Sequence, residues 1–353
     1  MKIIRSHCWK REFKLTEPFR IAYETVDHCE NVFLQVETDN NIVAVGCAAP
    51  DMYITGESGD MVLEHYNDRI EPLLHSADPF RYVRILEDLK NDMAGARSTL
   101  AMVDIMLYDL LAKCAGIPLY KLLGGYRESI PTSITIGISS LEETLEKIQY
   151  WYKTGFRIFK IKGGLNVTDD IEKIIKIREV FKTRITLSFD ANQGYSVAEA
   201  IKFINATQHS GVELFEQPTP RDEFEWLGMV TRKTEVPVIA DESLVSLKDA
   251  YRISKNGLTD VVNIKLMKVG GITESLHINS VAKSAGIEAM VGCMEECALG
   301  ISAGLHFALS RPNIAYADLD GHLDLMDDPT LDALILRDGV LHPADRPGLG
   351  YVF

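Results

Sequence analysis

The sequence predicts an α/β fold in which a (β/α)8-type barrel of the TIM class follows an α+β module. From about residue 134, eight apolar runs recur 24 to 28 residues apart, centred near 135, 160, 188, 214, 239, 263, 289 and 316. Helical patterns lie between them, such as Val167 to Phe181 with its buried stripe of isoleucines. An open doubly wound sheet is the alternative, but only a barrel brings the ends of the strands to one central point.

Residues 1–125 differ from the barrel and predict an α+β module. Its strand-like stretches are Ile3–Leu15, Val32–Glu37 and Ile42–Ala48. A helix over Leu100–Ala115 is expected to stop at Gly116, before Pro118.

The barrel is expected to cover 126–325. The last stretch, 326–353, contains a hairpin pattern around Asp338-Gly339. Because it lies beyond the eighth strand, it is expected to pack back and complete the N-terminal module.

Composition favours a soluble globular protein and argues against several partners. The net charge of −14 disfavours nucleic acid and anionic membranes. No apolar run approaches the roughly 20 residues that span a bilayer, and the N-terminus lacks a signal-peptide core. Six scattered cysteines lack zinc-type pairs, so free thiols in the cytoplasm are expected. The oligomeric state stays open, a homo-oligomer included.

Two lysines, Lys160 and Lys162, lie two residues apart in one expected strand, so their side chains share a face. Neighbouring ammonium groups repel each other, which predicts a lowered pKa and a neutral amine that serves as a general base at pH 7. Solvated surface lysines are the ordinary alternative, but these two end a strand of a mostly buried sheet.

Three carboxylates close three consecutive apolar runs: Asp190, Glu216 and Asp241. Catalytic groups of a barrel lie at the carboxyl ends of its strands, where these side chains would converge. Three hard oxygen ligands suit Mg²⁺. Any one of them alone would more often cap a helix or pair with a lysine, but three in register predict one Mg²⁺ per active site.

A third lysine, Lys265, ends a further strand. If Lys162 and Lys265 face each other, a carbon acid between them loses a proton to one and regains it from the other, which inverts a stereocentre. A metal on the adjacent carboxylate would stabilise the enediolate. Lys162 and Lys265 are thus predicted as the acid/base pair, with Lys160 tuning Lys162 and contacting the substrate carboxylate.

The sequence resembles the enolase superfamily, and within it the muconate-lactonizing-enzyme-like subgroup. The matching motifs are Lys160-Ile161-Lys162, Asp190-Ala191-Asn192-Gln193-Gly194, Glu216-Gln217-Pro218, Ala240-Asp241-Glu242-Ser243, Asn263-Ile264-Lys265 with Gly270-Gly271, and Pro347-Gly348-Leu349-Gly350. The resemblance implies a (β/α)7β TIM-type barrel, an N-terminal module that caps its mouth, and a magnesium-dependent isomerase of the racemase or epimerase class. Asn192, Gln217 and Glu242 are expected to support the metal ligands.

The eighth strand distinguishes the reactions of this subgroup. Asp318 and Asp320 place two carboxylates on one face at the rim of the site. In dipeptide epimerases, which this chain also resembles at Ile54-Thr55-Gly56-Glu57, such a pair holds the α-ammonium of the substrate. A solvated pair in an acidic loop is the plainer interpretation. A dipeptide is the predicted substrate.

Specificity is expected from two capping loops, 18–27 and 50–54, and from the seventh strand. Family members that act on Ala-Glu would be expected to carry a basic residue where Glu24 stands, and Asp51 and Glu295 add further acids. Such a pocket would favour dipeptides that contain Lys or Arg. Thr135 and Met294 are expected to line the same pocket.

The alternatives stay open at this point. Glu24 and Asp51 could be solvated loop charges, which would leave an L-Ala-D/L-Glu epimerase. An N-acylamino acid racemase or an o-succinylbenzoate synthase uses the same site on substrates without a free α-ammonium. A barrel that binds but does not catalyse is the alternative from another class.

Overall fold

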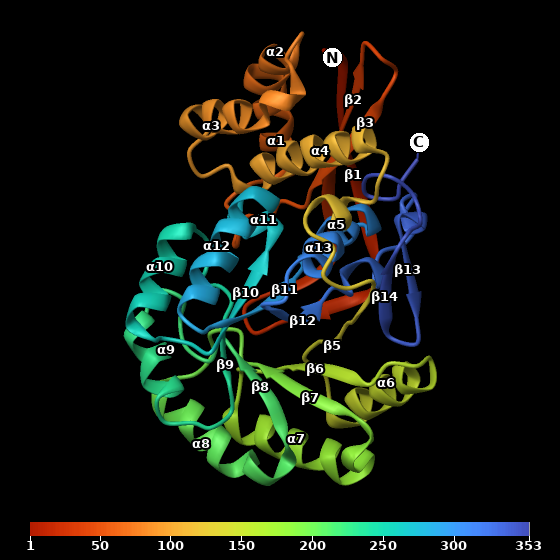
Figure 1. The fold of residues 1–353 in the computed structure, drawn as a ribbon. Helices are drawn as coiled ribbons and strands as arrows, with labels where there is room; N and C mark the ends of the chain where they lie inside the picture. Colours follow the sequence, from red (N-terminus) through yellow and green to blue (C-terminus); the bar gives the residue numbers. More distant parts are fainter. Residues whose placement is uncertain (353) are drawn as a thin grey trace.

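A computed structural model describes residues 1–352 of the chain (Figure 1). The N-terminal part is an antiparallel sheet of β1 (Ile3–Arg20), β2 (Thr25–Thr38) and β3 (Val43–Ala48), in that order. The helices against it are α1 (Gly59–His65), α2 (Glu71–Leu74), α3 (Tyr82–Asp92), α4 (Arg97–Ala115) and α5 (Leu119–Leu122). The predicted helix is therefore present, and it ends at Gly116 in the left-handed conformation (φ 68°).

The first two strands are longer than the sequence predicted. The segment expected as a loop, 18–27, is the tip of a long β1–β2 hairpin, and only residues 21–24 turn. The tip is held against the barrel, because the Ile138 amide donates to the Arg20 carbonyl (2.7 Å). Figure 1 shows this hairpin, in red, running from the N-terminal sheet down to the barrel.

Eight parallel strands form the second part of the molecule. They pair in chain order as β5 (Ile134–Ile136), β6 (Ile158–Lys162), β7 (Thr186–Asp190), β8 (Val212–Glu216), β9 (Val238–Ala240), β10 (Val261–Lys265), β11 (Glu288–Gly292) and β12 (Ile314–Asp318). The Ser133 amide bonds the Ala317 carbonyl (3.1 Å), which brings the first strand beside the last.

Helices cover the outside of this barrel (Figure 1). They are α6 (Leu141–Lys153), α7 (Val167–Phe181), α8 (Val197–Thr207), α9 (Phe224–Thr231), α10 (Leu247–Asn256), the short α11 (Leu266–Val269), α12 (Ile272–Ser284) and α13 (Ala298–Ser310). After β12 the described chain forms two short 3-10 turns, Gly321–Leu323 and Leu331–Ala333, before its C-terminal hairpin. The architecture is the predicted (β/α)7β barrel with an α+β N-terminal domain.

The C-terminal segment lies between the two parts. The hairpin β13 (Leu334–Arg337) and β14 (Val340–Pro343) pairs with β4 (Ile130–Pro131) at the entry to the barrel. Beyond it, the Leu349 amide donates to Asp109 of α4 (2.8 Å). The boundaries near residues 125 and 325 stay a prediction.

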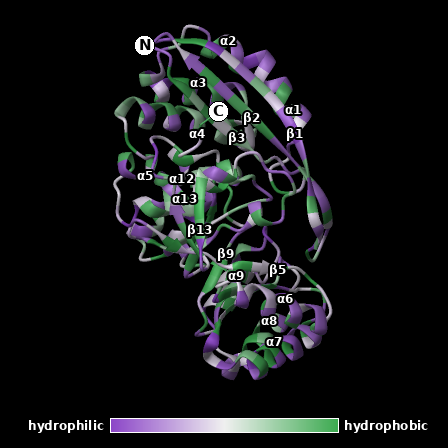
Figure 2. Ribbon diagram, turned by 90° about the vertical axis from the view of Figure 1, so that its right-hand side faces the viewer, coloured by the Kyte–Doolittle hydropathy of each residue, from purple (hydrophilic) through white to green (hydrophobic). Residues whose placement is uncertain are grey.

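Hydrophobic residues gather where the strands pack. In Figure 2, β9 is green, whereas β2, α7 and α8 mix green and purple, as elements with one buried face do. Among the helices of residues 1–352, none combines the length and hydrophobicity needed to cross a membrane.

Candidate active site

The two lysines of β6 point into the barrel beside carboxylates. Lys160 is 2 % exposed, and its Nζ lies 2.9 Å from Glu216 Oε1, 2.9 Å from Asp318 Oδ2 and 3.1 Å from Asp190 Oδ2. Lys162 Nζ donates to Asp190 Oδ2 at 2.7 Å. Both ammonium groups therefore lie within one buried ionic network.

This environment corrects the predicted electrostatics of the pair. Burial lowers the pKa of Lys160, but Asp318, Glu216 and Asp190 outweigh it, so that the pKa lies well above its ordinary value. The prediction that lysine–lysine repulsion lowers a pKa is wrong for Lys160, because carboxylates from three other strands surround it more closely.

The turn that follows β6 fixes the end of this strand. Gly164 has a φ of +99°, and a Cβ there would lie 2.0 Å from the Ala191 carbonyl oxygen, so only glycine fits. The Gly163 amide donates to the Asp190 carbonyl (2.9 Å), and the Gly164 amide donates to Asp170 Oδ2 (2.9 Å). These bonds bind the end of β6 to that of β7 and hold Lys162 beside Asp190.

The three carboxylates predicted to bind metal converge. Asp190, Glu216 and Asp241 are all buried, and one oxygen of each lies within 4.8 Å of one oxygen of the others. Each of the three has a hydrogen-bonded neighbour. The backbone amide of Asn192 donates to the Asp190 carboxylate (2.8 Å), and Asn263 Nδ2 donates to the Glu216 carboxylate (3.0 Å). The backbone amide of Asp241 donates to Gln217 Oε1 (2.9 Å).

This donor set fits a hard divalent cation. Three carboxylate oxygens close together are the ligands that Mg²⁺ prefers. The Oδ1 of Asn192, buried beside Asp190, has no hydrogen-bond partner among the described residues, and its Nδ2 lies 3.4 Å from Glu242 Oε1. A cation with bound water would satisfy both the clustered charge and an unpaired amide oxygen.

A second pair of lysines lies on the other side of the cluster. Lys265, at the end of β10, places its Nζ 2.8 Å from Asp241 Oδ2. Lys268, in α11, is fully buried and donates to the Asp241 carboxylate and to its carbonyl. Although burial opposes it, Lys265 and then Lys268 hold the pKa of Asp241 well below its ordinary value.

Sequence reasoning missed Lys268. Its only signal was the spacing, since a residue three positions after Lys265 in a helix lies near the same face.

The end of β12 carries a second buried carboxylate pair. Asp318 Oδ1 accepts from Ser133 Oγ (2.5 Å) and Thr135 Oγ1 (3.3 Å), while its Oδ2 meets Lys160. Asp320 Oδ2 accepts from the Thr135 amide (2.5 Å). Burial and the neighbouring Asp318 raise the pKa of Asp320 to about 7. Asp318 thus has a cationic partner, whereas Asp320 has none among residues 1–352.

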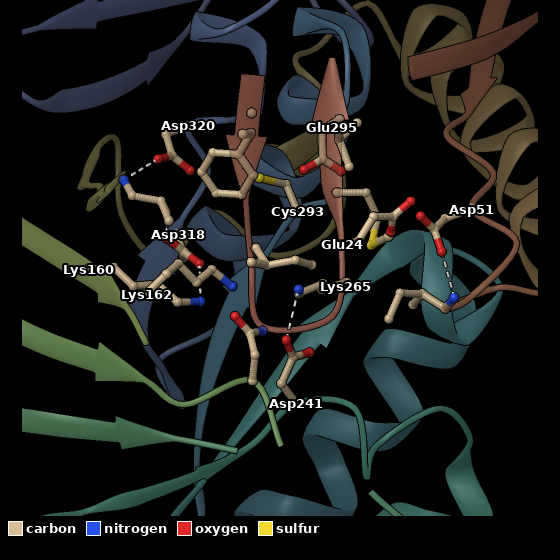
Figure 3. Close-up of a pocket in the computed structure, with 18 of the residues that line it drawn as sticks. Glu24, Asp51, Lys160, Lys162, Asp241, Lys265, Cys293, Glu295, Asp318 and Asp320 are labelled. Carbon is tan, nitrogen blue, oxygen red and sulfur yellow. Dashed lines mark hydrogen bonds and ion pairs between the residues drawn. The ribbon is translucent and has the colours of Figure 1, made fainter. Parts of the chain in front are cut away.

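Above these groups lies a pocket with about 830 Å³ of empty space, open solvent at its mouth included. Its lining includes the predicted substrate contacts: Glu24, Asp51, Thr135, Met294, Glu295, Asp318 and Asp320. Asn192 and Glu242 also line it, whereas Gln217 lies beneath and orients Asp241. Figure 3 shows Asp318 and Asp320 at one end, on the side of Lys160 and Lys162, and Asp51 at the opposite end.

The acids of the mouth repel one another. Burial, Asp51 and Glu295 raise the pKa of Glu24. The Asp51 carboxylate accepts from the Ile54 amide (2.6 Å), but no hydrogen bond or ion pair to the Glu24 carboxylate occurs in the described chain. Asp324 lines the same pocket and was not predicted to do so.

Two tyrosines from separate capping segments meet over the pocket. Tyr23, at the hairpin tip, stacks on Tyr53 with ring centroids 4.2 Å apart. The Arg221 guanidinium lies 5.2 Å from the centre of the Tyr53 ring. Burial and the carboxylates below raise the pKa of Tyr23, so its hydroxyl stays protonated. No sequence pattern indicated this contact.

Family models match both parts of the chain. Residues 4–124 match the N-terminal domain of mandelate racemase and muconate lactonizing enzyme, and residues 143–353 match the enolase C-terminal domain-like family. The chain belongs to the enolase superfamily.

Curated relatives within this superfamily cover nearly the whole chain. An L-Lys-D/L-Arg epimerase of Desulforapulum autotrophicum is 40% identical over 99% of both chains. An L-Ala-D/L-Glu epimerase of Bacillus subtilis is 36% identical over 100% of this chain and 97% of its own. The solved dipeptide epimerase of Methylococcus capsulatus, complexed with Mg and L-Arg-D-Lys, is 34% identical, covers 100% of both chains and superposes with a TM-score of 0.95. The prediction of an isomerase of the racemase and epimerase class is confirmed.

Proposed function

We propose that this protein is a Mg²⁺-dependent dipeptide epimerase that inverts an α-carbon by proton transfer between Lys162 and Lys265. We further propose that it prefers dipeptides with Lys or Arg in one or both positions. The observation that carries the first part is the pairing of two lysines, from β6 and β10, with opposite members of one carboxylate cluster.

The proposed chemistry follows from this arrangement. Asp190, Glu216 and Asp241 would hold the cation, which when bound stabilises the negative charge that develops on the substrate carboxylate. Because that carboxylate belongs to the second residue of the dipeptide, the proton of this residue's α-carbon becomes acidic. Lys162 and Lys265 reach it from strands on either side of the cluster, so one removes the proton and the other returns a proton to the opposite face.

The carboxylates at the end of β12 support a substrate with a free α-ammonium. Asp320 is buried without a cationic partner, and its pKa near 7 reflects that unbalanced charge. An incoming ammonium would supply the missing partner. N-acylamino acids and o-succinylbenzoate precursors lack this group, so the geometry favours a dipeptide over them.

The mouth supports the preference for cationic substrates. Glu24, Asp51 and Glu295 line the pocket, and the Glu24 carboxylate is unpaired within residues 1–352. A cationic side chain there would relieve the mutual repulsion, whereas the glutamate of Ala-Glu would increase it. The name of the Desulforapulum relative and the ligand of the Methylococcus structure agree with a preference for cationic dipeptides.

Solvent exchange tests the reaction. The protein is incubated with Mg²⁺ and a dipeptide library in D₂O, and each substrate is followed by mass spectrometry. The expected result is a gain of about one dalton in the turned-over dipeptides, confined to the second residue, because the lysine that removes the α-proton and the one that returns a deuteron both exchange with D₂O. No exchange with any dipeptide would eliminate the epimerase and favour a barrel that only binds.

Two lysine variants assign the bases. Lys162→Ala and Lys265→Ala should each abolish inversion, and each should retain α-proton exchange from one configuration only, with opposite configurations for the two variants. Lys248→Ala, at an exposed position of α10, is the matched control and should exchange at the wild-type rate. The same residual pattern in both catalytic variants would contradict a two-base mechanism.

Substrate comparison tests the charge preference. We expect kcat/KM for Lys- and Arg-containing dipeptides to exceed that for Ala-Glu, and Glu24→Gln to narrow the gap. Glu12→Gln, which removes an exposed acid from β1, serves as the control. A clear preference for Ala-Glu would end the cationic part of the proposal while leaving the epimerase intact.

A further inference from the structure

Asp324 lies on the same wall of the pocket as the proposed ammonium site. It follows Asp320 after the short 3-10 turn, and the Leu323 amide bonds the Asp320 carbonyl (2.8 Å). The Thr16 amide donates to the Asp324 carbonyl (2.8 Å), and Leu325 forms a β-bridge with Leu15. The backbone at Asp324 is thus held between β1 and the barrel, which fixes where the side chain enters the pocket.

The Asp324 carboxylate lacks a hydrogen-bond or ion-pair partner among the residues that the structure describes. The lysine in its neighbourhood, Lys147, donates to Glu17 instead (2.5 Å). Burial and the nearby Glu17 and Glu295 raise the pKa of Asp324 to about 6. A half-buried acid that faces a cavity without a counter-charge would gain from a cation supplied by a ligand.

The two acids that follow Asp324 have other roles. Asp328 accepts from the Ala298 amide (2.6 Å) at the start of α13 and from Thr330 (2.7 Å), so it caps a helix. Asp327 is exposed outside the pocket, and its carbonyl accepts from Arg11 (2.7 Å). Within this acidic segment only Asp324 lines the pocket.

The pocket acids fall at two ends of the cavity. Asp324 interacts electrostatically with Asp320 and Glu295, whereas Glu24 interacts with Asp51 and Glu295. Figure 3 shows Asp320 and Asp51 at opposite ends with Glu295 between them. With the α-ammonium of the dipeptide at Asp318 and Asp320, the side chain of its first residue starts at the end where Asp324 lies. The reacting second residue, between the lysines, would then direct its side chain toward Glu24 and Asp51.

We propose that Asp324 is a specificity-determining residue that pairs with a cationic side chain on the first residue of the dipeptide, while Glu24 and Asp51 receive that of the second. The enzyme therefore recognises the charge of each residue separately, and its best substrates carry Lys or Arg in both positions. This inference rests on the proposed epimerase function.

The test compares two dipeptides of the same composition, L-Lys-L-Ala and L-Ala-L-Lys. Asp324→Asn should lower the ratio of their kcat/KM values (Lys-Ala over Ala-Lys) by about tenfold or more, chiefly through KM, because it removes one charge partner. Glu24→Gln should raise the same ratio. Asp324→Glu keeps the charge, so it should retain the wild-type preference between Lys-Ala and Ala-Lys. Asp327→Asn is the matched control and should leave the ratio of the two kcat/KM values unchanged.

The possible outcomes distinguish failure of the Asp324 proposal from failure of the proposed epimerase function. If the wild-type protein turns over dipeptides but Asp324→Asn leaves the ratio unchanged, Asp324 does not determine specificity while the epimerase stands. A shift in the same direction for Asp324→Asn and Glu24→Gln would overturn the assignment of the two ends. If no dipeptide is turned over, the proposed function falls and this inference falls with it. Thermal unfolding of Asp324→Asn should occur at the wild-type temperature or above it, since the amide is isosteric and the lost carboxylate is disfavoured by burial, Glu17 and Glu295.

Discussion

Replacing Lys160 with methionine measures how much one buried ammonium stabilises the active site. Its Nζ lies 2.9 Å from Glu216, 2.9 Å from Asp318 and 3.1 Å from Asp190, and the side chain is 3% exposed. Methionine keeps the length and the apolar stem but removes the charge. We expect the free energy of unfolding to fall by about 3–5 kcal/mol in Mg²⁺-free buffer at pH 7, the cost of removing one partner from a buried ion pair.

The magnitude follows from two opposing contributions. At an effective dielectric constant of about 20, a unit charge about 3 Å from another contributes roughly 5 kcal/mol, so three contacts sum to about 15 kcal/mol. Burying the ammonium costs several kcal/mol, and in the variant proton uptake by Glu216, whose pKa burial raises to about 8, offsets part of the remainder. In the variant Lys162 stays beside Asp190 and balances the charge of that carboxylate. A net loss of a few kcal/mol remains.

Denaturant unfolding with EDTA and with saturating Mg²⁺ tests this estimate. Because a divalent cation supplies the missing positive charge, Mg²⁺ should stabilise Lys160→Met more than it stabilises the wild type. Lys176→Met is the control, since Lys176 and its partner Glu179 are both 54% exposed, and it should change stability by less than about 0.5 kcal/mol. If Lys160→Met and Lys176→Met unfold at the same denaturant concentration in EDTA, the network does not stabilise the fold as argued.

Three further predictions concern the substrate, the metal and pH. Asp318→Asn and Asp320→Asn should raise KM for dipeptides about tenfold or more while hardly affecting N-acetylated analogues, because only the former present an ammonium; equal effects on both in steady-state assays would contradict the ammonium site. EDTA should abolish exchange and Mg²⁺ should restore it, except in Asp241→Asn, whose melting temperature should also lose its response to Mg²⁺. Burial lowers the pKa of His306 to about 3, so between pH 6.5 and 4 the unfolded chain binds a proton there that the folded chain does not, and stability falls with falling pH by about 1.4 kcal/mol per unit. His306→Gln should show a slope shallower by that amount in unfolding experiments, and an unchanged slope would refute the assignment.

The convergence of the three carboxylates could be predicted from the sequence because parallel strands impose a strict geometry. The runs that form β6 to β10 and β12 each end at a charged residue, and a barrel brings the carboxyl ends of its strands together. Asp190, Glu216 and Asp241 therefore converge as expected although they lie on different strands. The position of each carboxylate at a strand end was sufficient to predict that the three meet, and the conformation of the loops was not needed.

The electrostatics of that centre could not be predicted in the same way. Lys160 and Lys162 are neighbours in sequence, so their mutual repulsion was visible, whereas the carboxylates of β7, β8 and β12 approach Lys160 only in the folded barrel. The sum of those long-range contacts reverses the sign of the pKa shift. The extent of β1 and β2 has a similar origin, since the hairpin tip is held by a bond to Ile138 of the barrel.

Substrate specificity is the hardest property to predict from the sequence. The residues proposed to determine it belong to segments whose orientation depends on tertiary contacts. Asp324, Asp327 and Asp328 are nearly adjacent and chemically alike, yet one lines the pocket, one is exposed and one caps α13. The bridge between Leu15 and Leu325 makes the difference, since it fixes this segment against β1. The same β1 continues into the hairpin that bears Glu24. One strand thus positions acids at both ends of the cavity, so changes in its docking would alter recognition of both substrate residues while the strand-borne lysines and carboxylates keep their chemistry.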